Sequence, residues 1–175
     1  MHEYIKSHQN IFKGKKVLEI SCGCGMVSFT LCLIDAELII ATDLEDILNT
    51  NTKNNLILNK LEDKKNIKLL PLEWNNEKHI NNLFNLYPHL DYIILSECLY
   101  EDAPFDKLLL TLIKLSKFYK NIEIFFIYKK RYIFQDKCIE KLKKYYEIEN
   151  IDRNDIHQDF RNNDNYQFFK IKIIK

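Results

Sequence analysis

The sequence of 175 residues predicts a single α/β domain, built on a mostly parallel β-sheet with helices on both faces. Strand-like and helix-like segments alternate along the chain, as they do in βα units. The strand-like segments are apolar throughout, which is typical of parallel strands that are covered on both faces. No internal repeat or linker divides the sequence, so residues 1–175 are expected to form one domain.

The first two expected strands each lead into a helix. Residues 16–20 (KVLEI) predict a short buried strand, and a glycine-containing turn then leads into an apolar helix over 26–34. Residues 38–42 (LIIAT) predict a second buried strand, followed by a helix with a polar face over 45–59. A helix between two strands allows the crossover that parallel pairing requires.

The middle of the chain continues this alternation. Residues 67–70 predict a third strand, and the helix over 77–86 is expected to end before Pro88, because helices usually stop ahead of a proline. Residues 92–95 (YIIL) predict the fourth strand. The helix over 104–118 begins with a proline, which suits the first turn of a helix.

The C-terminal part completes the sheet. Residues 122–128 are rich in aromatic and β-branched side chains and predict the fifth strand, with a helix near 137–145. A weaker strand is expected over 146–151, and residues 166–174 (YQFFKIKII) predict the last one.

The charge balance bears on possible partners. The chain has 26 basic and 25 acidic side chains, which gives a formal net charge of +1. An obligate nucleic-acid-binding protein usually has a clear basic excess, so we expect no nucleic-acid partner.

The cysteines and apolar runs bear on compartment. The number of cysteines, 5, is odd, and they lack the spacing of a secreted disulfide framework. Cys22 and Cys24 have no second Cys/His pair downstream, so we expect no metal site. The longest apolar runs, such as 122–128, are far shorter than the ~20 residues of a membrane-spanning helix. We therefore expect a soluble, monomeric protein of the cytoplasm, with the nucleus as an alternative.

One candidate site stands out at the ends of the first two strands. The first strand runs into Glu19-Ile-Ser-Cys-Gly-Cys-Gly25, where Gly23 and Gly25 let the backbone approach a ligand without a Cβ clash. The second strand ends at Asp43, about 20 residues beyond the glycines, where an acid can accept both hydroxyls of a ribose. In open α/β sheets, ligands bind at the carboxyl ends of the strands. The pattern indicates an adenosine-containing cofactor, although an ordinary βα turn followed by a solvated acid would look similar.

The phosphate-binding version of this site fits less well. The chain has no Gly-Lys-Ser/Thr of a P-loop, and Ser21 stands in the place of the first glycine of the dinucleotide fingerprint. Two acids, Glu19 and Asp43, flank the turn. They suit a cofactor that carries a cationic amino acid and a ribose better than one that carries a pyrophosphate.

Five segments carry a resemblance to a known family. They are, in chain order, residues 17–28 (VLEISCGCGMVS), 41–45 (ATDLE), Asn55 with Asn59, 72–74 (LEW) and 91–100 (DYIILSECLY). The chain resembles the seven-β-strand, S-adenosylmethionine-dependent methyltransferases, and within them the protein lysine methyltransferases that act on chaperones, AAA ATPases and translation factors. It is most similar to the valosin-containing-protein lysine methyltransferases. The resemblance implies a Rossmann-like class I fold, a seven-stranded sheet with an antiparallel C-terminal strand.

The resemblance also implies a set of cofactor-binding residues. These are Glu19, Ser21, Gly23, Gly25, Asp43, Leu44, Trp74 and Ser96. By similarity, Glu19 and the turn at 23–25 would hold the methionine part of S-adenosylmethionine. Asp43 would bind the ribose hydroxyls, and Trp74 would lie beside the adenine.

The same resemblance implies the residues that meet the substrate. Glu97 and Tyr100 would receive the target lysine, Ser96 and Glu97 would line the mouth of the pocket, and Tyr128 would form a further wall. A carboxylate attracts an ammonium group, and aromatic faces stabilise cationic amines by ~0.5–2 kcal/mol each.

Each of these side chains has a structural alternative. Trp74, the single Trp of the chain, could fill the core, and Tyr100 and Tyr128 are two of 10 tyrosines that could serve for packing. Glu97 is harder to explain by packing, because a charge that ends an apolar strand is costly unless it lies in a cleft or is paired.

The sequence departs from the family at two places. Ser21 replaces the usual first glycine, which costs free energy if the backbone requires a positive φ. Residues 1–12 alone precede the first strand, so we expect the family's N-terminal segment to be missing or truncated, with Tyr4 as a remnant.

The leading hypothesis is therefore an S-adenosylmethionine-dependent protein lysine N-methyltransferase, acting on a cytosolic protein such as a chaperone or AAA ATPase. Two alternatives stay open: methylation of a small molecule, an N-terminus or RNA, and a non-catalytic binding module with the same fold. The absence of an Asn/Asp-Pro-Pro-aromatic motif disfavours methylation of bases and of glutamine.

Overall fold

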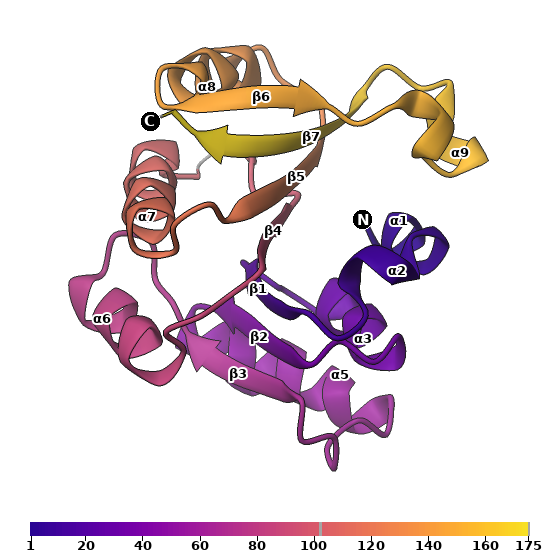
Figure 1. Cartoon of the computed structure of the whole chain (residues 1–175), viewed down its shortest axis with the longest axis vertical. Helices are drawn as coiled ribbons and strands as arrows, with labels where there is room; N and C mark the ends of the chain where they lie inside the picture. Colours follow the sequence, from indigo (N-terminus) through magenta and orange to yellow (C-terminus); the bar gives the residue numbers. More distant parts are fainter. Residues whose placement is uncertain (102, 175) are drawn as a thin grey trace.

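The computed structural model describes residues 1–101 and 103–174, and its strands form a single seven-stranded sheet in the order β3-β2-β1-β4-β5-β7-β6 (Figure 1). The strands are β1 (Lys16–Ile20), β2 (Leu38–Asp43), β3 (Ile67–Pro71), β4 (Tyr92–Ser96), β5 (Glu123–Lys129), β6 (Tyr146–Asn150) and β7 (Tyr166–Ile173). The pairs among β1 to β5 are parallel, whereas β7 lies antiparallel between β5 and β6. The predicted fold class, a mostly parallel sheet with an antiparallel C-terminal strand, is confirmed.

Helices cover both faces of the sheet, as predicted. They are α1 (His2–Ser7), α2 (Gln9–Phe12), α3 (Met26–Leu33), α4 (Glu45–Ile47), α5 (Lys53–Leu58), α6 (Glu77–Leu86), α7 (Phe105–Phe118), α8 (Phe134–Lys143) and α9 (Gln158–Arg161). In Figure 1, α6, α7 and α8 lie on one side of the sheet, and α1 to α3, α5 and α9 lie on the other. None of the helices in these described residues is long and apolar enough to cross a membrane.

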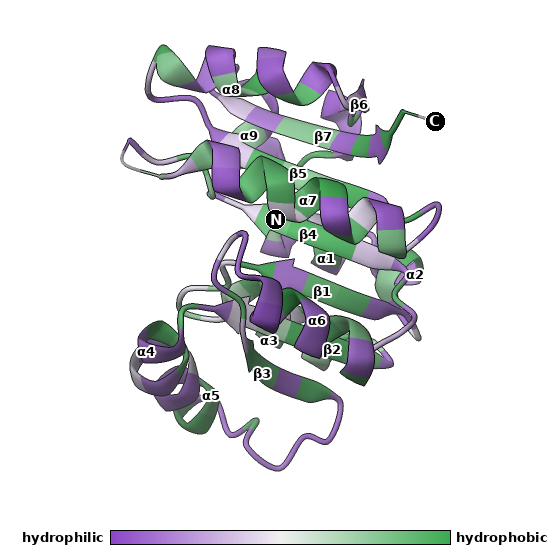
Figure 2. Cartoon of the chain, turned by 90° about the vertical axis from the view of Figure 1, so that its left-hand side faces the viewer, coloured by the Kyte–Doolittle hydropathy of each residue, from purple (hydrophilic) through white to green (hydrophobic). Residues whose placement is uncertain are grey.

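The strands bury side chains on both faces, which explains their uninterrupted apolar sequences. On β1, Leu18 and Ile20 join the cluster under α6 to α8, whereas Val17 joins the cluster under α1 to α3. Figure 2 shows the central strands mainly in hydrophobic colours behind α6 and α7. Fully burying an aliphatic side chain contributes about 1.5–3 kcal/mol, so these two layers supply the main stabilisation of the domain.

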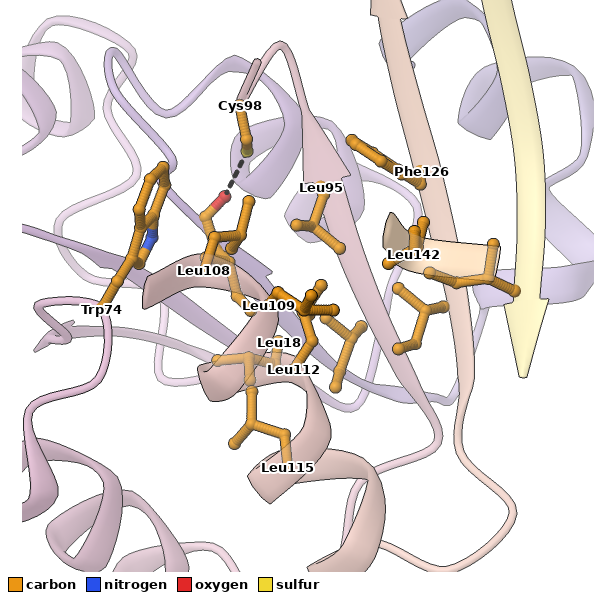
Figure 3. Close-up of a cluster of buried hydrophobic side chains, with 14 of the residues drawn as sticks. Leu18, Trp74, Leu95, Cys98, Leu108, Leu109, Leu112, Leu115, Phe126 and Leu142 are labelled. Carbon is orange, nitrogen blue, oxygen red and sulfur yellow. Dashed lines mark hydrogen bonds between the residues drawn. The ribbon is translucent and has the colours of Figure 1, made fainter. Parts of the chain in front are cut away.

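Helix α7 illustrates how one apolar stripe positions an element. Leu108, Leu112 and Leu115 recur at helical spacing, are fully buried and point toward the strands (Figure 3). This packing fixes the first turn of α7 near the carboxyl end of β4.

The first residues of the chain pack on the opposite face. The ring of Phe12 lies 5.1 Å from that of Phe125 and 5.7 Å from that of Tyr92, measured between centroids. Tyr4 is also buried there and contacts the same Phe125 ring. These contacts tie α1 and α2 to the middle of the sheet.

Several elements differ from the sequence prediction. The expected helix over 45–59 is divided into α4, a π-helical segment over Leu48–Thr52 and α5. Helix α8 begins at Phe134 rather than near 137, and β5 continues to Lys129 rather than ending at 128. The short helices α1, α2 and α9 and a 3₁₀ turn over Arg153–Asp155 were not predicted.

Candidate functional site

A pocket of about 520 Å³ lies at the carboxyl ends of β1, β2, β3 and β4. This is the place where the strand order reverses, since β2 and β4 flank β1 on opposite sides. The residues that line the pocket are Ser21, Gly23, Asp43, Leu44, Ile47, Asn51, Leu72, Glu73, Trp74, Glu97, Tyr100, Pro104 and Lys107. Six of the predicted site residues therefore meet in one cavity with Tyr100, from the ends of four strands and the loops that follow them.

The turn after β1 uses the conformational freedom of its two glycines in different ways. Gly23 has a φ of 53° and faces the pocket, with no atom within 4 Å of the position of a Cβ. Gly25 has a φ of 86°, and a Cβ there would lie 2.4 Å from the ring of Phe29. Gly23 thus opens the pocket wall, whereas Gly25 allows α3 to start directly beneath the turn.

The carboxylate of Asp43 is held by two backbone amides. Gly23 N donates to Oδ2 and Leu44 N donates to Oδ1, each at 2.8 Å. Each carboxylate oxygen has a second lone pair, so the group can still accept hydrogen bonds from a ligand. The two bonds fix its orientation at the pocket.

The glycine turn is also anchored from the helix that follows β2. Thr52 Oγ1 donates to Gly23 O at 2.7 Å, and Asn55 Nδ2 donates to Cys24 O at 3.1 Å. Thr52 ends the π-helical segment, and such segments frequently occur at functional sites. The turn is therefore held by side chains rather than by its own sequence alone.

Glu19 lies behind the turn and is almost completely buried, with 2% of its surface exposed. Its Oε2 accepts hydrogen bonds from the backbone N and the Oγ of Ser28. Burial raises the pKa of the Glu19 carboxyl to about 7, against the lowering effect of the Ser28 hydrogen bonds. Glu19 and Gly25 are predicted cofactor-binding residues that do not line the pocket.

Trp74 is both a core residue and a pocket residue, which the sequence analysis treated as alternatives. Its side chain belongs to the core cluster under α7 and also lines the pocket (Figure 3). Its Nε1 donates to Ser21 Oγ at 3.2 Å, and its ring lies 6.5 Å from that of Tyr100. Ser21 has a φ of 58°, the conformation in which the family's glycine would be free of strain.

Glu97 follows β4 with a φ of 60°, and hydrogen bonds hold it at the end of β5. Its backbone N donates to Ile127 O at 2.8 Å, and its Oε1 accepts from Lys129 N at 2.7 Å. Its Oε2 accepts from Arg131 Nη1 at 2.5 Å. The carboxylate is thus placed at the mouth of the pocket and is paired with a cation.

Tyr100 lies at the open end of the pocket, with 53% of its surface exposed. Partial burial raises the pKa of its hydroxyl, so the phenol stays protonated near neutral pH. The ring and the hydroxyl are both accessible to an incoming side chain.

Tyr128 and Ser96 are placed elsewhere. Tyr128 is 3% exposed, packs against Phe126 and Phe169, and lines a different cavity beside α8. Burial raises the pKa of Tyr128 to about 12. The structure thus corrects the prediction that Tyr128 is a wall of the same channel. Ser96 pairs with Ile127 at the end of β4 and does not line the pocket either.

Sequence reasoning assigned no role to six lining residues. These are Ile47, Asn51, Leu72, Glu73, Pro104 and Lys107. Ile47 and Asn51 lie four positions apart after Asp43, a spacing that could have marked a helix face beside the site. Leu72 and Glu73 belong to the LEW segment, whereas no signal pointed to Lys107. Among the described residues, no group of His, Cys, Asp and Glu is arranged to hold a metal ion.

Two curated relatives have similar sequences. The chain is 26% identical over 116 residues to the electron transfer flavoprotein beta subunit lysine methyltransferase homolog of Caenorhabditis elegans, covering 65% of this chain and 48% of the relative. It is 33% identical over 110 residues to methyltransferase-like protein 23 of Dictyostelium discoideum, covering 56% and 42%. The chain thus spans about half the length of these relatives.

A solved structure supports the fold. The chain matches a protein described as a methyltransferase in complex with S-adenosylhomocysteine, with a TM-score of 0.61 and 16% identity. The match covers 98% of this chain and 47% of that protein. At this identity the likeness establishes the fold alone.

The family is given by a sequence model. The model of the lysine methyltransferase family matches residues 1–145, which include all the strand ends and loops that form the pocket. The chain belongs to the lysine methyltransferase family.

Proposed function

We propose that this chain uses S-adenosylmethionine to methylate the ε-amine of a lysine on another protein. The observation that carries the proposal is a single pocket, in a member of the lysine methyltransferase family, that joins Asp43 and Trp74 to Glu97 and Tyr100.

The part of the pocket lined by Gly23, Asp43, Leu44 and Trp74 fits the cofactor. The whole pocket has a volume of about 520 Å³, which lies within the range of small-molecule sites. Asp43 has lone pairs for ribose hydroxyls, Trp74 and Leu44 offer apolar surface to an adenine, and Gly23 leaves the wall open. When bound, S-adenosylmethionine supplies an electrophilic methyl group on a sulfonium.

The part of the pocket lined by Glu97 and Tyr100 fits a lysine side chain. Beside its bonds to Lys129 N and Arg131, the Glu97 carboxylate keeps lone pairs that can accept from an ammonium group. The Tyr100 ring stabilises such a group by cation–π attraction of about 0.5–2 kcal/mol. Both side chains come from the loop after β4, so they orient the amine together. Positioning of this kind is the main contribution a protein makes to a displacement reaction.

The identity of the protein substrate is a separate proposal. The sequence resemblance favours a cytoplasmic chaperone or AAA ATPase. The name of the Caenorhabditis elegans relative adds the beta subunit of electron transfer flavoprotein as a second candidate. Purified examples of each class, offered as substrates, would decide between them.

Calorimetric titration with S-adenosylhomocysteine tests the cofactor site. Asp43→Asn should weaken binding by about 1.5–3 kcal/mol, because it removes a charged acceptor. Asp46→Asn is the matched control, since Asp46 is an exposed acid of α4 that does not line the pocket. Equal affinity for the wild type and Asp43→Asn would refute the role of Asp43, and no binding by the wild type would refute the cofactor.

Product analysis tests the reaction. The chain is incubated with methyl-labelled S-adenosylmethionine and a dialysed cell extract, and the labelled product is hydrolysed and analysed for ε-N-methyllysine. Glu97→Ala and Tyr100→Phe should slow its formation with little change in affinity for S-adenosylhomocysteine. Label in RNA instead of methyllysine would contradict the proposed substrate class.

A further inference from the structure

We infer that Gln135 is a positioning residue for the acceptor end of the pocket, which it holds in place by clamping the Glu97–Tyr100 loop to the end of β5. The inference rests on the proposed function, because it concerns the same lysine-binding end. Gln135 lies in the first turn of α8, does not line the pocket, and would act through other residues.

The side-chain amide of Gln135 is fully buried, with 0% of the residue exposed, and it makes four hydrogen bonds. Its Nε2 donates to Leu99 O at 2.7 Å and to Lys129 O at 3.3 Å. Its Oε1 accepts from Arg131 N at 2.7 Å and from Tyr132 N at 3.1 Å. Both hydrogens of the amide and both oxygen lone pairs are therefore used.

These four bonds join two segments that lie far apart in the sequence. Leu99 belongs to the loop that carries Glu97 and Tyr100, whereas Lys129 ends β5 and begins the segment that leads through Arg131 and Tyr132 to α8. The same segment binds the Glu97 carboxylate, through Lys129 N and the Arg131 guanidinium. Gln135 thus fixes both the loop that presents the carboxylate and the groups that orient it.

The loop needs such a clamp because its conformation is strained. Glu97 has a φ of 60°, a left-handed conformation that is unfavourable for a residue with a Cβ. Strain of this kind persists only where surrounding contacts over-determine the backbone. Without the bond to Leu99 O, the loop could relax and move Glu97 and Tyr100 relative to the cofactor part of the pocket.

Two variants remove the clamp in different ways. Gln135→Met keeps the approximate volume and loses all four hydrogen bonds. Gln135→Glu, when ionised, can still accept from Arg131 N and Tyr132 N but cannot donate to Leu99 O. Leu142→Ala is the matched control, because it damages the buried face of the same helix and leaves the four hydrogen bonds of Gln135 in place.

Three measurements on the full chain test the inference. The first is the initial rate of methyllysine formation, measured at low concentrations of the dialysed extract. At these concentrations the rate is proportional to the concentration of extract, so it reports kcat/KM. The second is calorimetric affinity for S-adenosylhomocysteine. The third is amide hydrogen exchange over residues 97–101.

Both Gln135 variants should lower kcat/KM about 10²-fold, the effect of misplacing reacting groups by about 1 Å. Their affinity for S-adenosylhomocysteine should stay at the wild-type level, and exchange over 97–101 should become faster. Leu142→Ala should melt at a lower temperature yet keep the wild-type kcat/KM at a temperature where it is folded.

Wild-type kcat/KM in both Gln135 variants would overturn the inference, as would an equal loss in Leu142→Ala or wild-type exchange over 97–101. A wild-type chain that binds S-adenosylhomocysteine but forms no methyllysine would contradict the proposed function instead. In that case the exchange measurement alone still decides whether Gln135 holds the loop.

Discussion

Ser21 shows how one side chain compensates for an unfavourable backbone. Its φ of 58° costs about 1–2 kcal/mol for a residue with a Cβ. Its hydroxyl accepts the hydrogen bond of the Trp74 indole, and such a bond contributes about 0.5–1.5 kcal/mol. The hydrogen bond to Trp74 thus offsets part of the cost of the Ser21 backbone conformation, and it fixes the Trp74 ring in the wall of the pocket.

Substitutions at Ser21 should separate these two effects. Ser21→Ala keeps the strain and loses the hydrogen bond, whereas Ser21→Gly loses the same bond and relieves the strain. Ser21→Gly should therefore be more stable than Ser21→Ala by about 1 kcal/mol in urea unfolding. Equal midpoints would show that the positive φ carries no cost here.

The buried carboxyl of Glu19 should make stability depend on pH. Burial raises its pKa from 4.5 to about 7, so the folded chain keeps a proton that the unfolded chain loses in between. The free energy of unfolding of the wild type should therefore fall, relative to Glu19→Gln, as pH rises from about 4.5 to about 7. The shift corresponds to about 3 kcal/mol at most.

Denaturant unfolding of the wild type and Glu19→Gln at a series of pH values would measure this difference. A difference that stays constant between pH 4.5 and pH 7 would mean that the group is already ionised in the folded chain.

At the scale of single residues, most of the site residues predicted from the sequence line the pocket, whereas Glu19, Gly25, Ser96 and Tyr128 do not. Asp43, Gly23 and Trp74 lie together because strand ends and turns bring them to one edge of the sheet. Tyr128 was misplaced because β5 continues to Lys129. One more strand residue puts Tyr128 inside the strand, where it packs in the core rather than facing the carboxyl end.

The connection between β2 and β3 shows the limit of periodicity for whole elements. The pattern predicts one helix over 45–59, but the structure inserts a π-helical segment before α5. Thr52 and Asn55 bind carbonyls of the glycine turn, about 30 residues earlier in the chain. A contact of this range leaves no local signal, so the irregularity could not be read from the helix itself.

Gly25, at the N-terminus of α3, leaves room for the ring of Phe29 in the first turns of the same helix. Gly25→Ala should destabilise the chain by about 1–2 kcal/mol for the positive φ, and by about 1–3 kcal/mol more for the clash with Phe29. Gly14→Ala is the control, since Gly14 has a φ of 70° and nothing within 4 Å of a Cβ. Thermal unfolding of the two variants should therefore show the larger loss in Gly25→Ala; similar losses would mean that the Phe29 ring moves aside freely.

At the scale of the whole molecule, the class of fold was predictable and the strand order was not. Uninterrupted apolar strands such as β4 and β5 require cover on both faces, so they imply parallel sheet layers without further information. The order that places β7 between β5 and β6 depends on long-range pairing, and the family resemblance predicted only that the C-terminal strand is antiparallel.

Occupancy of the pocket should stabilise the entire domain. At a concentration 100 times its dissociation constant, S-adenosylhomocysteine should add about 2.7 kcal/mol to the free energy of unfolding. A rise in melting temperature that depends on ligand concentration would show this in the wild type, and the same ligand concentration should have a smaller effect on Asp43→Asn. An identical rise in both proteins would place the ligand outside the Asp43 site.

The two outer strands have a consequence for how the molecule meets its neighbours in a crowded solution. On β6, the exposed Glu147 and Glu149 stand opposite Lys172 and Lys170 of β7, and β3 carries the exposed Lys68 and ends at Pro71. Charges and proline on an edge strand oppose the addition of another strand. The edge strands β3 and β6 therefore pair poorly with a strand of another chain, which limits aggregation by strand addition at both edges of the sheet.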